Sequence, residues 1–202
     1  IVILSLPGIA SAQVTSTCEE PTSSAVLDVG DVRARVYNSR ALFWNGGRNL
    51  YEVPKGGRAN AIFASNIWIG GTVNGQFRSA MSDYGPYEFW AGPLDENGNP
   101  PADCSVYDRM YSVYRADIIA YEERGVATQD LRDWPTGLGA PTLDADGNRI
   151  PFDITIPLAE RENRLIDLDA GERPALLGDQ SIWWGMNDRG NTHEWASTDF
   201  GT

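Results

Sequence analysis

The sequence predicts a mainly β protein, an antiparallel β-sandwich-like domain with long loops. Two patterns point to this fold: apolar and polar residues alternate in short runs, and glycine turns separate these runs at frequent intervals. The third observation is that four of the seven tryptophans stand beside such runs, namely Trp44, Trp68, Trp90 and Trp183. An indole ring needs an apolar bed and a partner for its N–H group, so these residues either anchor a sheet core or form ligand-binding platforms. We expect them to anchor the strands.

The first 12 residues are typical of a partial secretory signal. An apolar run ends in Ala10-Ser11-Ala12, which matches a small-residue cleavage site, although the basic leader of such a signal is missing. A buried strand is the alternative interpretation. We therefore predict a secreted or cell-surface protein with a polar tail at residues 13–25 and a single β-rich domain at residues 26–202. No other stretch has the roughly 18 to 20 apolar residues of a membrane span, so no membrane insertion is expected.

Short strand signatures follow the tail. Residues 32–37 alternate with period two, as expected of a half-buried strand, and residues 50–53 form a second short run between glycine turns at 45–47 and 54–57. Further along, Asn74-Gly75 separates two strand-like runs, and this dipeptide predicts a hairpin.

The second half of the chain has weaker patterns. Between residues 107 and 124, apolar and aromatic residues recur at intervals of three and four, which fits one short helix or an aromatic strand pair; Gly125 supplies a helix stop. From 132 to 177, prolines, glycines and acids dominate and predict a long loop. Such a loop is uncommon in a compact domain unless something, such as an ion, organises it.

The two cysteines, Cys18 and Cys104, are 86 residues apart. Export favours a disulfide between them, and closing a loop of that length stabilises a fold by about 4–5 kcal/mol in the chain-entropy model. Two unpaired thiols are the alternative. The spacing contains no Cys-x-x-Cys unit, which argues against a cysteine-based zinc or redox site.

The chain is strongly acidic, with a formal net charge of −12. Because a polyanion would be repelled, this charge argues against binding of nucleic acid or anionic lipid. It leaves cations, neutral glycans and basic proteins as partners.

Calcium is the cation that the acidic loop suggests. Oxygen ligands alternate around a glycine turn at Asp144, Asp146 and Asn148, as in loops that wrap a hard cation. Further candidate ligands follow at Asp153, Asp167 and Asp169. The alternative is a solvated acidic loop in which Asp and Asn act as turn formers.

A ligand site could combine aromatic platforms with carboxylates. Trp90 and Trp184 are the candidate stacking platforms for an extracellular glycan, and Glu52 and Glu88 are the acids that stand beside aromatic residues. The single histidine, His193, lacks the nucleophile elbow of a hydrolase triad, so we interpret it as a surface or supporting residue.

Several phrases in the chain together resemble one family. They are residues 51–56 (YEVPKG), 67–71 (IWIGG), 89–94 (FWAGPL), 178–184 (GDQSIWW) and 187–193 (NDRGNTH). In this order they resemble the N-terminal region of large secreted bacterial proteins that carry a C-terminal sorting domain for type IX secretion. The resemblance covers roughly residues 27–195, and it implies an exported protein whose strands continue beyond residue 202. It implies no established reaction.

Two functions fit these observations. The first is a non-catalytic extracellular module of a larger secreted protein that serves as scaffold, adhesion or glycan-contact surface, possessing no enzyme activity. The second is a carbohydrate-active enzyme domain that uses paired carboxylates and tryptophan platforms. The enzyme requires two carboxyl groups roughly 5–10 Å apart across an open cleft, beside an exposed tryptophan face.

Overall fold

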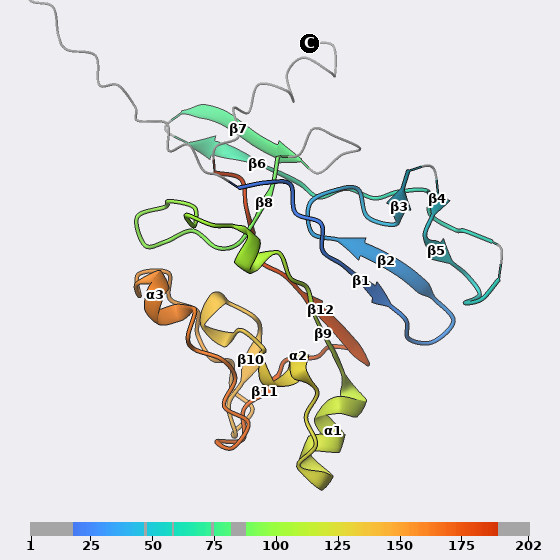
Figure 1. Cartoon of the computed structure of the whole chain (residues 1–202), viewed down its shortest axis with the longest axis vertical. Coiled ribbons are helices and arrows are strands. Elements are labelled where there is room, and N and C mark those ends of the chain that lie inside the picture. The colour runs from blue at the N-terminus through green and yellow to red at the C-terminus, as the bar shows by residue number, and fades with distance from the viewer. Residues whose placement is uncertain (1–17, 47, 58, 74, 82–87, 190–202) are drawn as a thin grey trace, which may run out of the picture.

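The computed structural model describes residues 18–46, 48–57, 59–73, 75–81 and 88–189. Within these ranges the chain forms thirteen strands, every named pair of which is antiparallel, and three short α-helices (Figure 1). The predicted mainly β fold is therefore confirmed. The signal sequence predicted at residues 1–12 and His193 both lie outside the described residues. No helix in the described part is long and apolar enough to cross a membrane.

The N-terminal strands form a three-stranded sheet in the order β1-β2-β5, with a small hairpin beside it. The bounds are Ser24–Leu27 for β1, Arg33–Tyr37 for β2, Trp44–Asn45 for β3, Arg48–Asn49 for β4 and Tyr51–Glu52 for β5. Ser24 pairs with Tyr37 and Arg33 pairs with Glu52, so β2 lies in the centre. The strands predicted at 32–37 and 50–53 are both present, and β1 begins within the last residues of the predicted tail.

The predicted hairpin around Gly75 is also present. It joins β6 (Trp68–Val73) to β7 (Gln76–Met81), and Gly75 has the positive φ of 78° that favours glycine. Trp68 was expected to anchor the core, but its side chain is 61 % exposed. The reason is that the two strands of this hairpin pair only with each other among the described elements.

Residues 105–124 combine a strand and a helix. A 3₁₀ turn (η1, Ser105–Tyr107) is followed by β9 (Tyr111–Tyr114) and α1 (Arg115–Arg124). Both alternatives predicted for this region occur: the short helix is α1, and the aromatic residues before it form β9, which pairs with β12 (Gln180–Trp183), far away in sequence. The helix begins at a capping interaction, in which the Tyr114 N–H donates to Asp117 at 2.8 Å, and it ends at Gly125.

The segment predicted as a long loop contributes three residues, Trp134, Ala140 and Ile166, to an apolar core cluster. The short helix α2 (Gln129–Arg132) ends where this segment begins. The segment itself forms η2 (Thr136–Leu138), β10 (Thr142–Leu143), α3 (Leu158–Arg161) and β11 (Arg173–Pro174), and β11 pairs with β10. Trp134, only 1 % exposed, lies at the centre of a cluster completed by Val113, Ala127, Leu131, Ala140 and Ile166. Its indole N–H donates to the Pro141 carbonyl at 3.3 Å. Burial of this ring organises a segment that has little pattern of its own.

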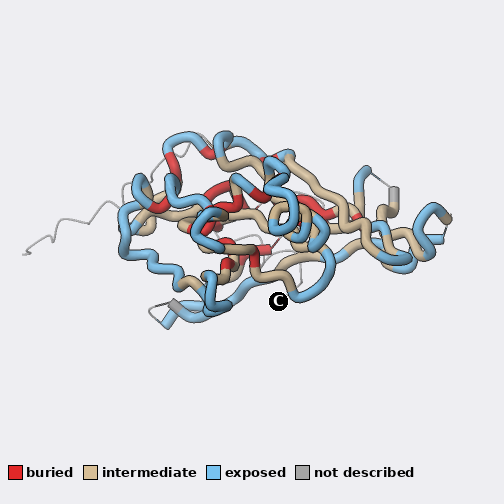
Figure 2. The backbone as a smooth tube through the Cα atoms, turned by 90° about the horizontal axis from the view of Figure 1, so that it is seen from below, coloured by how far each residue is buried: buried red, intermediate tan, exposed pale blue. Residues whose placement is uncertain are grey.

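Two further contacts connect distant parts of the chain. Cys18 and Cys104 form the predicted disulfide, which joins the N-terminal segment to the start of η1. Near the other end, β8 (Trp90–Ala91) pairs with β13 (Met186–Asn187). In Figure 2 the buried stretches concentrate in the wide part of the molecule, whereas its narrow end is mainly intermediate or exposed.

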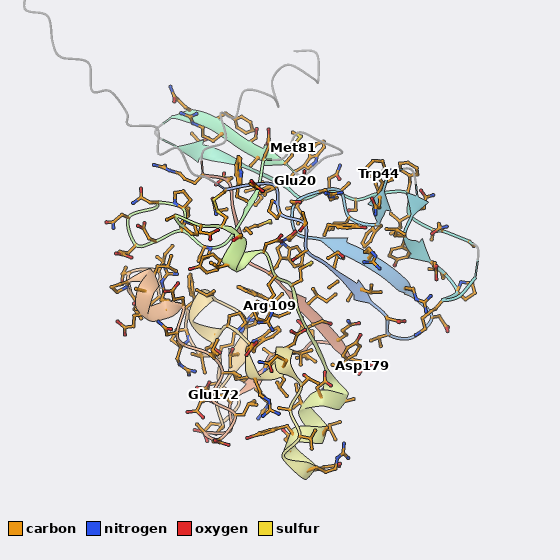
Figure 3. All side chains as sticks on the ribbon, in the orientation of Figure 1. Glu20, Trp44, Met81, Arg109, Glu172 and Asp179 are labelled. Atoms are coloured by element: carbon orange, nitrogen blue, oxygen red, sulfur yellow. A yellow bond between two sulfur atoms is a disulfide. The ribbon has the colours of Figure 1, made fainter. Side chains whose placement is uncertain are left out.

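Polar contacts fasten α2 to β9. Arg109, labelled in Figure 3, donates to Asp133 at 2.7 Å and to Asp130 at 2.9 Å, and the Ser112 N–H donates to the second oxygen of Asp130. The Arg109 guanidinium also lies 4.4 Å from the centroid of the Tyr111 ring. This network holds the helix against the strand that bears the core residue Val113.

Candidate functional site

The two acids proposed for glycan chemistry have structural partners. Glu52, on β5, forms an ion pair with Arg33 at 3.4 Å and accepts the Gly56 N–H at 3.2 Å. Glu88 is only 3 % exposed, and its Oε2 accepts the Met81 N–H at 2.7 Å. Glu88 was predicted as a ligand contact, but its carboxylate is buried against the Met81 backbone at the end of β7, and its Oε1 has no hydrogen-bond partner among the described residues.

The two proposed stacking platforms lie on neighbouring segments. Trp90 pairs with Asn187 across the β8–β13 sheet, and Trp184 lies in the short connection that leads into β13. Both rings are half-buried, and the Trp184 Nε1 is buried without a hydrogen-bond partner. Neither tryptophan lines either of the cavities described below. The structure therefore brings the tryptophans near each other and leaves Glu52 in a separate sheet.

The acidic turns are closed by hydrogen bonds within themselves. Asp144 accepts the Asn148 N–H at 2.8 Å. This hydrogen bond is the main cause that lowers the pKa of the Asp144 carboxyl. A second turn, at 167–171, packs beside the first, since a Cβ on Gly171 would lie 3.1 Å from the Ala145 side chain. Asp146 and Asn148 thus lie in a turn that neighbours Asp167 and Asp169. Within the described residues no group of three or more His, Cys, Asp and Glu side chains is placed to hold a metal, and calcium remains a prediction.

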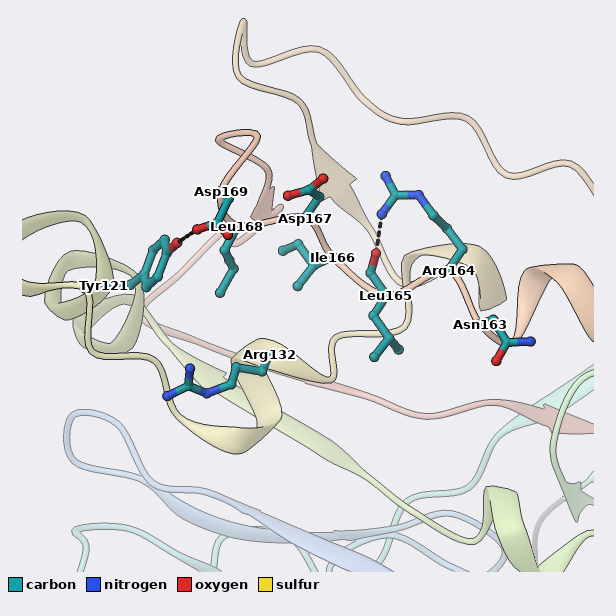
Figure 4. Close-up of a pocket in the computed structure, with 10 residues that line it drawn as sticks. Tyr121, Arg132, Asn163, Arg164, Leu165, Ile166, Asp167, Leu168 and Asp169 are labelled. Atoms are coloured by element: carbon teal, nitrogen blue, oxygen red, sulfur yellow. Dashed lines mark hydrogen bonds between the residues drawn. The ribbon is translucent and has the colours of Figure 1, made fainter.

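An open groove of about 840 Å³ contains Asp167 and Asp169 (Figure 4). The Tyr121 hydroxyl donates to Asp169 at 2.9 Å, which raises the pKa of Tyr121. Asp167 accepts the Ala170 N–H at 2.9 Å, so its carboxylate closes the local turn. Arg132 faces this segment from α2 (Figure 4). The groove is lined by acidic and basic side chains, and these already have partners within the protein.

A second cavity, of about 450 Å³, lies on the other side of the segment that follows α3, and Asn163 and Arg164 line both. We call it the Arg161 cavity. Its wall contains Ile150, Pro151, Phe152, Asp153, Ile156, Glu160 and Arg161, together with Thr136 and Gly137. This combination of an apolar wall with a few polar side chains is typical of small-molecule sites.

Arg161 is the unusual residue of this cavity, because its side chain is charged and only 2 % exposed. Its Nε donates to the Ile156 carbonyl at 2.8 Å and its Nη2 to the Leu94 carbonyl at 2.9 Å. The Nη1 group is buried and has no hydrogen-bond partner in the part of the chain that the structure describes. Buried arginines are ordinarily paired with a carboxylate, whereas this one makes no ion pair within the described residues.

Two glycines position the side chains of the cavity. A Cβ on Gly137 would lie 2.1 Å from the Arg161 carbonyl oxygen, so only glycine allows η2 to approach α3 this closely. Gly139 has a φ of 98°, and a Cβ there would lie 3.3 Å from the Phe152 ring. Phe152 is thereby placed with its ring centroid 5.5 Å from the Arg161 guanidinium.

Sequence reasoning did not identify Arg161 or Phe152. Both stand in the segment predicted as a loop, and Asp153 was assigned there only as a calcium ligand. The Asp153 carboxylate instead accepts the Thr155 N–H and hydroxyl at 2.8 and 2.7 Å. No local pattern marks an arginine for burial, because its partners Leu94 and Ile156 come from different segments.

No protein-family model, curated protein or solved structure matches this chain.

Proposed function

We propose that this chain is a non-catalytic, exported module of a larger secreted or cell-surface protein, and that it contacts extracellular glycans. The observation that carries this proposal is that both candidate acids already have partners within the fold. Glu52 is paired with Arg33, and Glu88 is buried against the Met81 N–H. A glycosidase would need such carboxylates facing each other across an open cleft.

The disulfide supports export. Bonds of this kind persist in oxidising compartments and are rare in the cytosol, and Cys18 follows closely on the apolar run and cleavage motif of a signal sequence. The phrases that resemble those of type IX secretion proteins support the same location. The net charge of −12 favours a neutral glycan over an anionic partner such as nucleic acid.

Binding and turnover on the same ligands test this proposal. The oxidised chain would be applied to an array of neutral and acidic oligosaccharides, with calcium or with a chelator, and the captured oligosaccharides would be analysed for hydrolysis. We expect capture without cleavage. Cleavage would favour the carbohydrate-active enzyme, and a failure to capture any glycan would contradict the glycan-contact role. Capture of a glycan in the presence of calcium but not in the presence of the chelator would support the predicted calcium site.

A further inference from the structure

We infer that the Arg161 cavity is a binding site for an uncharged sugar residue, with Phe152 as the stacking face and Arg161 and Asp153 as hydrogen-bonding groups. The inference rests on the proposed glycan contact. It assigns that contact to a place and a ligand class that differ from the tryptophan platforms suggested by the sequence.

The first argument is the incomplete pairing of Arg161. A guanidinium has five N–H donors, and its Nη1 group has no acceptor here although the atom is buried. A buried donor without a partner costs about 1–3 kcal/mol, and more when the group is charged. Arg161 lines the cavity, so the site favours a ligand that bears acceptor oxygens over one that has none.

The second argument concerns charge. Asp153 and Glu160 line the cavity together with Arg161 and Arg164, so an anionic ligand would meet two carboxylates as well as the acidic surface of the whole chain. A cationic ligand would meet the guanidinium groups of Arg161 and Arg164. A neutral ligand whose groups both donate and accept avoids both conflicts. Sugar hydroxyls have this property, since each can accept from Arg161 or donate to a carboxylate.

The Asp153 carboxylate can accept a hydrogen bond from a sugar hydroxyl. Thr155 holds Oδ1 with two hydrogen bonds, which leaves Oδ2 for a ligand hydroxyl. The same two bonds, helped by the charge of Arg161, lower the pKa of Asp153 and keep it ionised. An ionised carboxylate accepts stronger hydrogen bonds than a neutral group.

The third argument is the apolar wall. The Phe152 side chain is 49 % exposed and stands beside Ile150, Pro151 and Ile156. A sugar ring has an apolar C–H face that packs on an aromatic ring, while its hydroxyls point to the polar residues at the edge. The volume of about 450 Å³ lies in the range of small-ligand sites.

The test measures binding by full-length variants in calorimetric titrations. The probe is the neutral oligosaccharide of glucose, galactose, mannose or N-acetylglucosamine that the wild type captures best, with oligogalacturonate as the acidic comparison. Phe152→Ala and Asp153→Asn are each expected to weaken binding about tenfold, as loss of a stacking contact or of a charge-assisted hydrogen bond would do. Phe77→Ala and Asp31→Asn are the matched controls, since they remove an exposed aromatic ring and an exposed acid from other elements.

The outcomes separate this inference from the proposed function. If the wild type binds a neutral oligosaccharide and both cavity variants bind it equally well, the assignment to the Arg161 cavity is wrong while the glycan-contact role stands. Tighter binding of oligogalacturonate would overturn the charge argument. If the wild type binds no glycan, the proposed function fails together with this inference. Unchanged circular dichroism and melting temperature in the variants exclude misfolding as the cause of any loss.

Discussion

The strands that precede residue 82 and the segments that follow residue 104 are stabilised by different means. The later part has an apolar cluster around Trp134, which is 1 % exposed. In the earlier part many buried residues are small or polar, such as Ala34, Asn38 and Ser39; larger buried apolar residues there are Val36, Tyr37 and Met81, and the β6–β7 hairpin exposes large apolar side chains. The comparison teaches that the clearest strand signatures do not coincide with the main hydrophobic core.

The earlier part depends on attachment to the later part. Besides the Cys18–Cys104 disulfide, Asp108 accepts hydrogen bonds from Thr22, from Ser23 and from Asn38, at 2.7–2.9 Å. Gln180 extends this attachment from β12, since its side chain bonds the backbone on either side of Leu27. Polar and covalent links here replace the apolar contacts that join the segments around Trp134.

The largest effect is expected for Trp134→Ala. Removing a fully buried indole leaves a cavity and should lower the free energy of unfolding by about 3–5 kcal/mol, measured by urea denaturation. Leu177→Ala is the control in the same half of the chain, because Leu177 is fully exposed and its truncation should change stability by less than about 0.5 kcal/mol. Equal costs for the two substitutions would remove the basis for placing the core at Trp134.

The second effect is loss of the disulfide. The double substitution Cys18→Ser with Cys104→Ser should cost about 2–4 kcal/mol, because the unfolded chain regains the freedom of an 86-residue loop. Hydrogen exchange should show faster exchange in β1 and β2, with the amides around Trp134 much less affected. Uniform acceleration over both parts would mean that they unfold as one unit, which would contradict the proposed division of stabilising contacts.

The third effect concerns Asp108 and pH. Desolvation by burial acts to raise its pKa, but hydrogen bonds from Thr22, Asn38 and Ser23 outweigh it and lower the pKa from 3.8 to about 2. Because the folded pKa is lower than the unfolded one, this carboxylate stabilises the fold above about pH 4. The contribution is on the order of 1–2 kcal/mol after solvent screening, and it is lost as the pH falls towards 2.

Urea denaturation between pH 6 and pH 2 measures this contribution. Asp108→Asn should be less stable than the wild type at pH 6, and the difference should shrink as the wild-type carboxylate becomes protonated. Asp31→Asn, an exposed acid in the turn after β1, is the control and should keep the wild-type pH profile. A constant difference between Asp108→Asn and the wild type over this range would show that the Asp108 charge is not what stabilises the attachment.

Sequence reasoning was successful where the structure is local. The alternation at 32–37 and the turn at Gly75 depend on neighbouring residues only, so the strand and the hairpin could be predicted. The core and the Arg161 cavity depend on distant partners: the Trp134 carbonyl accepts the Ile166 N–H, and Arg161 reaches the Leu94 carbonyl. Such contacts leave no periodic signal in the sequence. The pattern of residues 132–177 therefore predicts a loop, although this segment contains part of the apolar core and most of the Arg161 cavity.

Dependence on distant partners also explains why the ligand-binding acids could not be predicted from the sequence. Aromatic neighbours suggested Glu52 and Glu88 as ligand contacts, but whether an acid stands free or bonded to backbone depends on the tertiary fold. The disulfide could be predicted because only two cysteines exist, so that export and pairing leave a single connectivity.

The smallest effect is expected at Phe77. Its ring is 73 % exposed on β7, so Phe77→Ser should change the free energy of unfolding by less than about 0.5 kcal/mol. Met81, at the end of the same strand, is only 5 % exposed, and Met81→Ala should cost about 2–5 kcal/mol in the same urea titration. A large cost at Phe77 would mean that the exposed face of the hairpin has apolar packing of its own, in addition to the burial of Met81.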